Sequence, residues 1–469
     1  MAGIFYKGET KVRPGVYYNV TANGEDDTAG AVNGVVAVLF RADFGPLNKL
    51  VEIDAAEGYE SVFGTGLGTD AMKYAIKGGA RKILAVRVGS GGNVSTATLK
   101  DESNAETVVE LKARYEGEKP FSILIREKLT DSNMLEGIIY SESKEVEKLS
   151  FAKGSDEVTS FVEAFAKSNY VTAVKKTEAD GKKILLNTQV SFTLGANPTV
   201  TNEDYASALK LVEAETFNVI CLDTEERAVQ FMMSAFLNRI EEAGQFAMGV
   251  VAEKMNVDLE QRMSNAAAFN DYKMHYVLNA NVTESIDTID GYQTAALMAG
   301  YIASVQSSIS LTHTVLRTVG QINEALSPSL ITKAEQNGCI VLSYSAGKNV
   351  WIDSAINTLI TLDENHDAGW KKIRRTKTRF ELMRRMNTTA EDMVGKVDND
   401  ANGRTTIVSK LAAVGEDMIV EGKLISCMVE EDPTQQSDTD SVWLNVSVVD
   451  KDSAEKIYLT FAFQFSTNQ

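Results

Sequence analysis

Helix-like and strand-like segments alternate between residues 201 and 307, and this alternation limits the possible folds more than any other feature of the chain. Helical patterns start at Thr201, Ala228 and Leu259, and each is followed by a short apolar run, at 218–223, 246–251 and 275–278. A further helix is predicted over 292–307. Strands separated by helices of about 10–15 residues form mostly parallel or mixed sheets with helices on their faces. The segment therefore predicts an α/β domain.

A similar unit lies nearer the start of the chain. The runs VVAVLF at 35–40 and KILAVRV at 82–88 are typical of buried strands, and the helical spacing of Ala71, Tyr74 and Ala75 predicts a helix between them. The run 339–345 is predicted to pair with 349–353 as a hairpin. We assign residues 21–92 and 198–345 to one α/β domain.

Residues 93–197 interrupt this pattern. They follow Gly89-Ser90-Gly91-Gly92, which has the composition of a flexible linker, and their strands alternate apolar and polar residues, as in VVELKARY at 108–115. One helix is predicted over 156–168, because Val158, Phe161, Val162 and Phe165 form an apolar stripe. The segment predicts an inserted β-rich domain.

Both ends of the chain are predicted to be extended. Pro14 fixes its own backbone and is followed by the β-prone Val16-Tyr17-Tyr18, so residues 1–20 form an arm. Near the other end, apolar side chains recur at every second position, which is typical of a strand; they are Ile457, Leu459, Phe461, Phe463 and Phe465. A strand at a chain end either pairs within its own sheet or is donated to another chain.

Residues 370–386 have the most unusual charge pattern. They contain a single acid, Glu381, and eight bases: Lys371, Lys372, Arg374, Arg375, Lys377, Arg379, Arg384 and Arg385. In a helix Lys371, Arg374, Arg375 and Arg379 recur on one face, while Ile373, Phe380 and Met383 can pack on the other. Residues 416–469 follow, with eleven acids and three bases.

Three interpretations of this basic helix remain open. It could be a solvated helix face, a grip on nucleic acid, or a site for an acidic protein surface. The chain has 65 acidic and 47 basic residues and a net charge of −18, so the rest of the molecule opposes nucleic acid. The basic face also lacks aromatic residues that could stack on bases. Among the two binding roles, an acidic protein surface is therefore the better partner, and we predict no nucleic-acid partner.

No catalytic or metal-binding motif is recognisable. The loop Gly64-Thr-Gly66-Leu-Gly68-Thr69 lacks the preceding strand and the third glycine of the dinucleotide fingerprint. Ser343-Tyr-Ser345-Ala-Gly347 is one residue short of a nucleophile elbow. His275, His313 and His366 lie far apart, without ligand spacing. We predict a binding or structural protein, with no enzyme activity, catalytic residue, metal or cofactor.

The cysteines and the apolar stretches of the sequence indicate the cellular compartment. The three cysteines, Cys221, Cys339 and Cys427, are widely spaced and odd in number, which excludes a disulfide framework and suits a reducing cytoplasm. No apolar stretch reaches the roughly 20 residues of a membrane span, and the start lacks the apolar run of a signal peptide. We therefore predict neither membrane insertion nor export by a standard signal.

Several segments taken together point to a family. Near the start they are RPGVYYNV, FGPLNKLVEI, FGTGLGT and KILAVRV, and towards the end KNVWIDSAINTL, WKKIRRTKTRFELM and FAFQF. In order and spacing they resemble the contractile tail sheath proteins of myovirus-type phages, defective prophage particles and phage-tail-like bacteriocins. The likeness covers most of the chain outside 93–197.

The resemblance implies an α/β sheath core with a mixed sheet, an inserted β-rich outer domain at 93–197, a carboxy-terminal sheath domain at 346–469 and extended terminal arms. It implies a structural subunit, assembled in the bacterial cytoplasm, that forms a homo-polymer of stacked rings or a helix around an inner tail tube. Contraction would drive the tube through a cell envelope, with baseplate and tail terminator proteins as further partners. The product would be a virion tail or a released particle.

Residue by residue, the resemblance assigns two sets of contacts. The eight bases of 371–385 would face the tube. The arms would pair with sheets of adjacent subunits, through Ile4, Phe5, Tyr6, Arg13, Pro14, Gly15, Val16, Tyr17 and Tyr18 at one end and the apolar positions 457–465 at the other. The alternative is a nucleotide-dependent α/β enzyme with an inserted substrate domain, suggested only by the strand and helix cycles and by Gly64 to Gly68.

Overall fold

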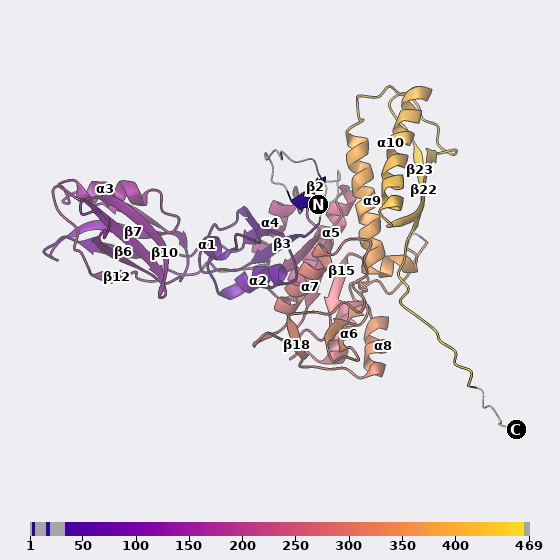
Figure 1. Cartoon of the computed structure of the whole chain (residues 1–469), viewed down its shortest axis with the longest axis horizontal. Helices are drawn as coiled ribbons and strands as arrows, with labels where there is room; N and C mark the ends of the chain where they lie inside the picture. The colour runs from indigo at the N-terminus through magenta and orange to yellow at the C-terminus, as the bar shows by residue number, and fades with distance from the viewer. Residues whose placement is uncertain (1, 5–15, 19–32, 365, 464–469) are drawn as a thin grey trace.

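The computed structural model describes residues 2–4, 16–18, 33–364 and 366–463. A seven-stranded sheet lies at its centre (Figure 1), a β-rich unit projects at one end of the long axis, and two helices with a β-hairpin project near the other. The predicted fold class, a mixed α/β core with an inserted β-rich unit, is confirmed. The division into separate domains at 92/93, 197/198 and 345/346 stays a prediction.

The central sheet combines strands from both sides of the inserted unit. Its strands are β3 (Val35–Phe40), β4 (Leu50–Asp54), β5 (Lys82–Arg87), β13 (Val219–Leu222), β14 (Met248–Ala252), β15 (Met274–Val277) and β19 (Cys339–Ile340), in the order β19-β15-β14-β13-β3-β5-β4. All pairs are parallel except β4 with β5. Apart from the edge strand β4, the strands are buried on both faces, which explains why they appear in the sequence as continuous apolar runs.

Helices cover both faces of this sheet. One face carries α2 (Asp70–Lys77), α7 (Tyr292–Ser304) and part of α9 (Ile373–Glu391); the other carries α4 (Asn202–Val212), α5 (Arg227–Glu242), α6 (Leu259–Ala267) and α8 (Pro328–Gln336). The short α1 (Glu60–Phe63) and the 3₁₀ turn η1 (Leu67–Thr69) precede α2. Helices α2 and α7 cross at Gly78 and Gly300, where a Cβ on Gly300 would lie 2.1 Å from the Ala75 carbonyl oxygen. Only glycine allows the two backbones to approach so closely.

The inserted unit consists of two facing sheets and one helix. Its elements are β6 (Val94–Lys100), β7 (Thr107–Glu116), β8 (Phe121–Glu127), β9 (Met134–Ser141), β10 (Lys144–Ala152), α3 (Glu157–Phe165), β11 (Val171–Lys175) and β12 (Gln189–Ser191). The sheets have the orders β10-β9-β8-β12 and β11-β7-β6. The predicted stripe of α3 packs into their common core through Val158, Phe161 and Phe165.

The junction of the inserted unit with the central sheet is packed, so the prediction of a flexible linker at 89–92 is wrong. The two crossings of the chain pair with each other through reciprocal hydrogen bonds between Ser90 and Thr199. Phe44 of the central domain is 1% exposed and its ring contacts Tyr115, Phe121 and Tyr170 in the inserted core. Gly89, Gly91 and Gly92 adopt positive φ angles where the chain crosses between the two units, which explains why glycine occupies these positions.

Smaller sheets complete the centre of the molecule. They are the antiparallel set β17 (Asp287–Ile289), β16 (Val282–Glu284) and β18 (Val319–Ile322), the hairpin of β20 (Leu342–Tyr344) with β21 (Val350–Ile352), and the parallel pair β1 (Ala2–Ile4) and β2 (Val16–Tyr18). The hairpin predicted from 339–353 is confirmed for 342–352. The strand predicted over 339–345 is divided, because β19 joins the central sheet while β20 pairs with β21.

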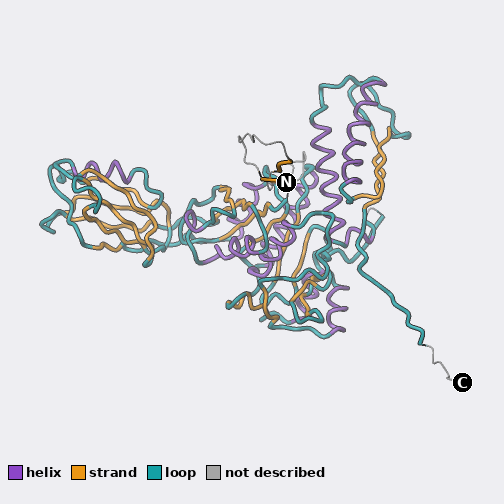
Figure 2. Tube along the Cα trace, in the orientation of Figure 1, coloured by secondary structure: helices purple, strands orange, loops and turns teal. Residues whose placement is uncertain are grey.

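The carboxy-terminal part begins with the 3₁₀ turn η2 (Ala368–Lys371) and α9. Helix α10 (Ala401–Val420) then packs on a hairpin of β22 (Leu424–Glu431) and β23 (Leu444–Asp450). The last described residues leave the body as an extended chain, drawn as loop in Figure 2. Within the described residues, no helix is long and apolar enough to cross a membrane.

Candidate functional site

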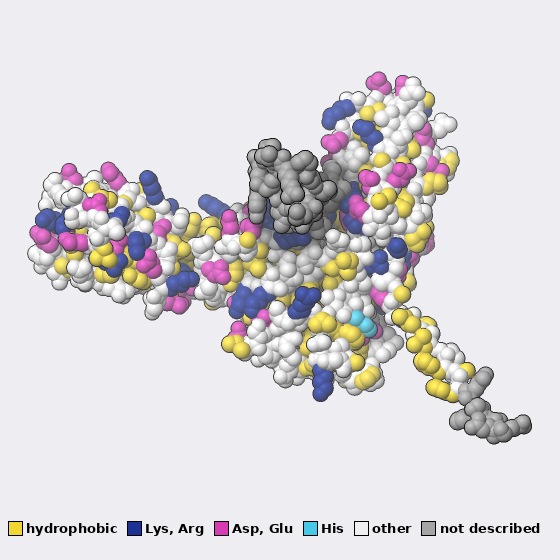
Figure 3. Space-filling view, viewed as in Figure 1, with side chains coloured by type: hydrophobic (Ala, Val, Ile, Leu, Met, Phe, Trp, Pro, Cys, Tyr) yellow, Lys and Arg dark blue, Asp and Glu magenta, His cyan; other side chains and the backbone are white. Residues whose placement is uncertain are grey.

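The carboxy-terminal chain from Ile457 to Phe463, here called the arm, exposes large apolar side chains. Ile457 is 77% exposed, Leu459 72%, Phe461 73% and Phe463 87%, and Figure 3 shows this apolar surface along the tail. The strand predicted over 457–465 pairs with no other strand over its described residues, 457–463. A contiguous apolar surface of this kind marks an interaction site. Phe465 lies outside the described residues.

The β22–β23 hairpin offers a surface of matching character. As a two-stranded sheet it has two edges without a neighbouring strand in the described structure. Exposed apolar side chains on the hairpin and just before β23 are Ile425, Met428, Trp443, Val446 and Val449, each at 42–60%. Met428 and Val449 share the face directed away from α10, whereas Val446 lies opposite Val429 on the other face. Isolated two-stranded sheets are marginally stable, and open edges are templates for a further strand. The arm does not reach its own hairpin, because it leaves the body in the opposite direction (Figure 1).

The amino-terminal arm is described only in part. Ile4 lies in β1 and Val16, Tyr17 and Tyr18 form β2, and the two strands pair in parallel with Ile4 opposite Tyr18. The other predicted arm residues lie outside the described residues: Phe5, Tyr6, Arg13, Pro14 and Gly15.

The basic helix of the sequence is α9, preceded by η2, but its cations do not form one exposed stripe. Arg374, Lys377 and Arg385 are 9%, 8% and 3% exposed. Of the four bases predicted to share one face, Arg374 is therefore buried, and the interpretation of a solvated face is wrong for it. The partners of Arg374, Lys377 and Arg385 lie in the same chain. Contact of the eight bases with an inner tube stays a prediction.

Arg385 belongs to a buried ionic network between α9 and the hairpin. Its guanidinium donates to both oxygens of Glu421, at 2.8 and 2.9 Å, and to Glu381. Lys423 Nζ donates to Glu381 Oε1 at 2.7 Å, and the Ser307 hydroxyl donates to the same carboxylate. Burial raises the pKa of Glu381, but Lys423, Ser307 and Arg385 together hold that pKa below its usual value. The network therefore fixes α9 and the hairpin to each other in an ionised state.

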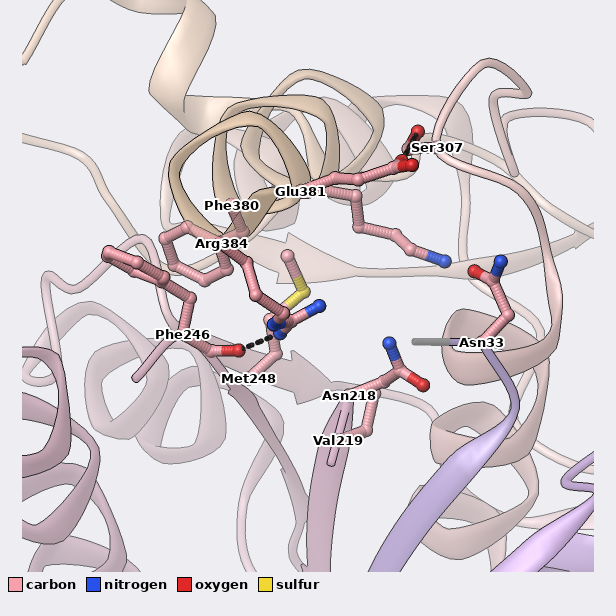
Figure 4. A pocket seen from close by; sticks show the side chains of 10 residues that line it. Asn33, Asn218, Val219, Phe246, Met248, Ser307, Phe380, Glu381 and Arg384 are labelled. Carbon is pink, nitrogen blue, oxygen red and sulfur yellow. Dashed lines mark hydrogen bonds between the residues drawn. The ribbon is translucent and has the colours of Figure 1, made fainter. Parts of the chain in front are cut away.

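Lys377 and Arg384 join α9 to the central domain. Lys377 donates to the carbonyls of Ile302 and Val305 at the end of α7, and burial lowers its pKa to about 7. Arg384 reaches the Phe246 carbonyl (Figure 4), and burial lowers its pKa to about 10. Both side chains line a cavity of about 20 Å³, which is room for one water molecule and no more. These cations are structural.

The buried amine of Lys377 makes a pH prediction. Its folded pKa is about 7, whereas an unfolded lysine titrates near 10.4, so between these values the unfolded chain binds one more proton. Stability must then rise with pH in this window, by up to about 1.4 kcal/mol per pH unit. A neutral amine keeps two N–H groups, enough for the two carbonyls.

The measurement compares urea unfolding of the wild type and Lys377→Met from pH 6 to 10. We expect the difference in unfolding free energy to change in favour of the wild type above about pH 7 and to stay constant below it. Parallel pH profiles of the two proteins would show that Lys377 remains protonated in the fold.

The remaining bases line one side of α9 and face the segment 450–455. Arg375 donates to both oxygens of Asp450, at 2.6 and 2.7 Å, and Arg379 donates to Asp367 at 2.9 Å. Lys371 is half-buried in η2. Lys372, Arg375 and Arg379 are thus paired with acids of the same chain, while the acidic protein partner that the sequence favoured stays a prediction. The sequence analysis did not identify Asp450, Asp452 and Glu455 as their partners, although the acidic excess of 416–469 was a signal for them.

The glycine-rich loop behind the enzyme alternative packs against a filled crevice. Parallel α/β sheets bind ligands where the strand order reverses, here between β3 and β13. At that point buried Asp223 accepts from Arg41 Nε at 2.7 Å and from the Tyr205 hydroxyl. A Cβ on Gly68 would lie 1.9 Å from Asp223, so the glycine serves close packing.

The other candidate catalytic and ligand residues also have structural environments. Ser343 donates to Asp353 and accepts from Trp351 Nε1, contacts that hold the β20–β21 hairpin together. His275 is fully buried beside the Gly249 carbonyl, and burial lowers its pKa to about 4. His313 stacks on Trp351. Within the described residues, no group of three His, Cys, Asp or Glu side chains could hold a metal ion.

Two family models match the chain. Residues 199–358 match the phage tail sheath protein central domain, and 365–464 match the phage tail sheath C-terminal domain. The Phage-like element PBSX protein XkdK of Bacillus subtilis (strain 168) is 23% identical over 486 residues, which cover 97% of this chain and 98% of that protein. The uncharacterized protein YqbK of the same organism is 23% identical over 388 residues, covering 79% and 78%.

Solved structures share the fold. The sheath tail protein from Desulfitobacterium hafniense has a TM-score of 0.70 at 17% identity, covering 93% of this chain and all of that one. The sheath tail protein Lin1278 from Listeria innocua has a TM-score of 0.67 at 22% identity, covering 90% and 96%. The helical sheath of the anti-feeding prophage in the contracted state has a TM-score of 0.57 at 11% identity, covering 97% and 99%.

Proposed function

This chain belongs to the phage tail sheath family and is a structural sheath subunit, and from this premise we propose that it polymerises around an inner tube and contracts to drive that tube through a cell envelope. The observation that carries the proposal is the exposed apolar arm, Ile457 to Phe463, in a chain that also has a hairpin with open edges. Within the described chain the arm buries none of these apolar side chains and pairs with no strand. Joining the sheet of a neighbouring copy would supply both apolar contacts and backbone hydrogen bonds.

The arm and the hairpin are complementary in the way that strand addition requires. Strand addition supplies backbone hydrogen bonds at the sheet edge, while alternate side chains enter the apolar surface. The arm presents Ile457, Leu459, Phe461 and Phe463 at alternate positions, and the hairpin presents Met428 and Val449 on one exposed face. We assign the partner hairpin to a neighbouring copy. The amino-terminal arm, with Ile4 to Tyr6 and Arg13 to Tyr18, is proposed to pair with neighbours in the same manner.

The same proposal gives the inserted unit a position on the outside of the sheath. The inserted unit projects from the central sheet at the end far from the hairpin (Figure 1), so it can lie outside a ring without blocking arm exchange. Its junction is packed through Phe44, so it would move with the core as one body. Contraction would then be a rearrangement of whole subunits joined by their arms. Assembly in a bacterial cytoplasm, and baseplate and terminator proteins as partners, belong to this proposal.

Contact with the inner tube is proposed for the bases that keep part of their side chains at solvent: Lys371, Lys372, Arg375 and Arg379. Lys372 is 27% exposed, Arg375 20% and Arg379 16% as side chains. Each of these three is already paired with an acid of its own chain, which weakens the positive electrostatic potential that they would exert on an inner tube. Co-sedimentation of the protein with purified tube at increasing salt tests this contact: binding that is insensitive to salt contradicts it.

Electron microscopy of the purified full-length chain tests the polymer. The expected result is regularly striated tubes or stacked rings that form without nucleotide. A protein that stays monomeric at all concentrations and is stabilised against heat by a nucleotide would instead support the enzyme alternative.

A further inference from the structure

The chain between β23 and the arm, residues 450–455, lies against α9 and is here called the root. Lys372 Nζ lies 2.8 Å from Asp452 Oδ2 and 3.1 Å from Glu455 Oε2. Arg374 Nη1 donates to the Ser453 hydroxyl at 2.9 Å. Arg375 also makes a bidentate contact with Asp450. Nearly every polar side chain of the root is therefore bound by a base of α9 or of its N-cap.

A second element holds the root from the other side. The hydroxyls of Ser310 and Thr312 each lie 3.2 Å from Glu455 Oε1, and the Lys451 amide donates to the Lys423 carbonyl at 3.0 Å, which prolongs the hairpin ladder. The chain is thus fixed at both ends of the root, by Asp450 and by Glu455. Directly after it, Ile457 is 77% exposed. The boundary between held and free chain falls at Lys456.

The contacts at Asp450 are of the strong kind. Asp450 is 8% exposed, so solvent and salt screen it little, and bidentate guanidinium–carboxylate pairs are stronger and more directional than single ones. Burial alone would raise the pKa of Asp450, but Arg375 and Arg379 hold that pKa below its usual value. Asp450 therefore stays ionised and bound at neutral pH.

We propose that the bases of α9 are an anchor for the arm: Lys372, Arg374, Arg375 and Arg379 are positioning residues that hold the root and so fix the direction in which the arm leaves the body. The inference rests on the proposed function, because direction matters only if the arm is donated. A root fixed in advance confines the arm to fewer orientations. It thereby raises the effective concentration of the arm at the neighbouring hairpin and lowers the ordering cost of assembly.

Charge reversal at Lys372 tests the anchor in the full-length chain. Lys372→Glu places a carboxylate against Asp452 and Glu455, whereas Lys410→Glu makes the same change of charge at an exposed lysine of α10, away from the root, and is the matched control. Trypsin cleavage after Lys451, inside the root, reports on the anchor, and cleavage after Lys456, beyond it, is the internal reference. Polymerisation is followed by light scattering.

We expect Lys372→Glu to speed cleavage after Lys451 at least tenfold relative to Lys456 and to slow polymerisation at least tenfold. Lys410→Glu should behave as wild type. The triple variant Lys372→Glu, Asp452→Lys, Glu455→Lys restores the charge pairs and should recover polymerisation. It also adds trypsin sites, so its root is assessed by the mobility of a spin label at position 457.

Two results separate this inference from the proposed function. If Lys372→Glu polymerises like wild type while a chain truncated after Lys456 does not, the arm matters but the anchor does not. If the truncated chain polymerises like wild type, the proposed strand donation itself is wrong. Unchanged cleavage after Lys451 in Lys372→Glu also overturns the anchor.

Discussion

Replacing Ile457, Leu459, Phe461 and Phe463 with serine is expected to abolish polymer formation while leaving the folded subunit intact. These side chains are 72–87% exposed in the single chain, so their loss removes no contact from its core. Burying each against a neighbour contributes about 1.5–3 kcal/mol, so four lost side chains weaken each contact by about 6 kcal/mol or more, roughly 10⁴-fold. Sedimentation velocity measures the polymer, and circular dichroism checks the fold.

The period of a strand supplies the matched control. Tyr458, Thr460 and Ala462 occupy the alternate positions and would face away from the sheet that the first set enters. The double variant Tyr458→Ser, Ala462→Ser should therefore reduce polymerisation much less than the variant in which Ile457, Leu459, Phe461 and Phe463 are all replaced with serine. Equal losses in both variants would show that the arm binds without a strand register, and no loss in either would remove the arm from assembly.

The second large effect is expected at the buried ionic network of α9. Glu381→Ala removes the carboxylate shared by Arg385 and Lys423, which are 3% and 9% exposed, and leaves their two charges with only Glu421. Removal of one partner from a buried ionic pair costs about 3–5 kcal/mol, because the remaining charge is desolvated without compensation. The change should lower the urea midpoint and should first release the hairpin from α9.

An exposed pair on the same molecule is the control. Glu213→Ala breaks the contact with Arg239, whose side chains are 40% and 51% exposed, and such pairs contribute only about 0–1 kcal/mol. Tryptophan fluorescence can follow both variants, since Trp370 packs beside Phe380 of α9. Similar urea midpoints for the two variants would mean that the network around Glu381 contributes no more than a surface pair.

Periodic patterns in the sequence predicted the regular elements well. The strands over 35–40 and 82–88 and the helix from Thr201 follow from apolar spacing and from a capping box, in which Thr201 and Asp204 exchange hydrogen bonds. These signals are local, so no knowledge of distant contacts is needed to recognise them. The prediction of a flexible linker at 89–92 was wrong for the opposite reason. The segment 196–199, which pairs with the chain at this junction, and the ring of Phe44 lie far away in the sequence.

The candidate site divides in the same way. Alternation at 457–465 by itself predicted a strand-forming segment with one apolar face, because side chains in an extended backbone point to opposite sides by geometry. The charge of α9 was equally plain, but its role was not. Lys372 meets Asp452 after 80 residues and Arg375 meets Asp450 after 75, and a helical period says which residues share a face without saying what covers it. Only the tertiary structure shows that the root packs against α9, so that bases which could have been exposed are paired within the chain. Ion pairs require partners within a few ångströms, and the order of residues along the chain does not fix such distances.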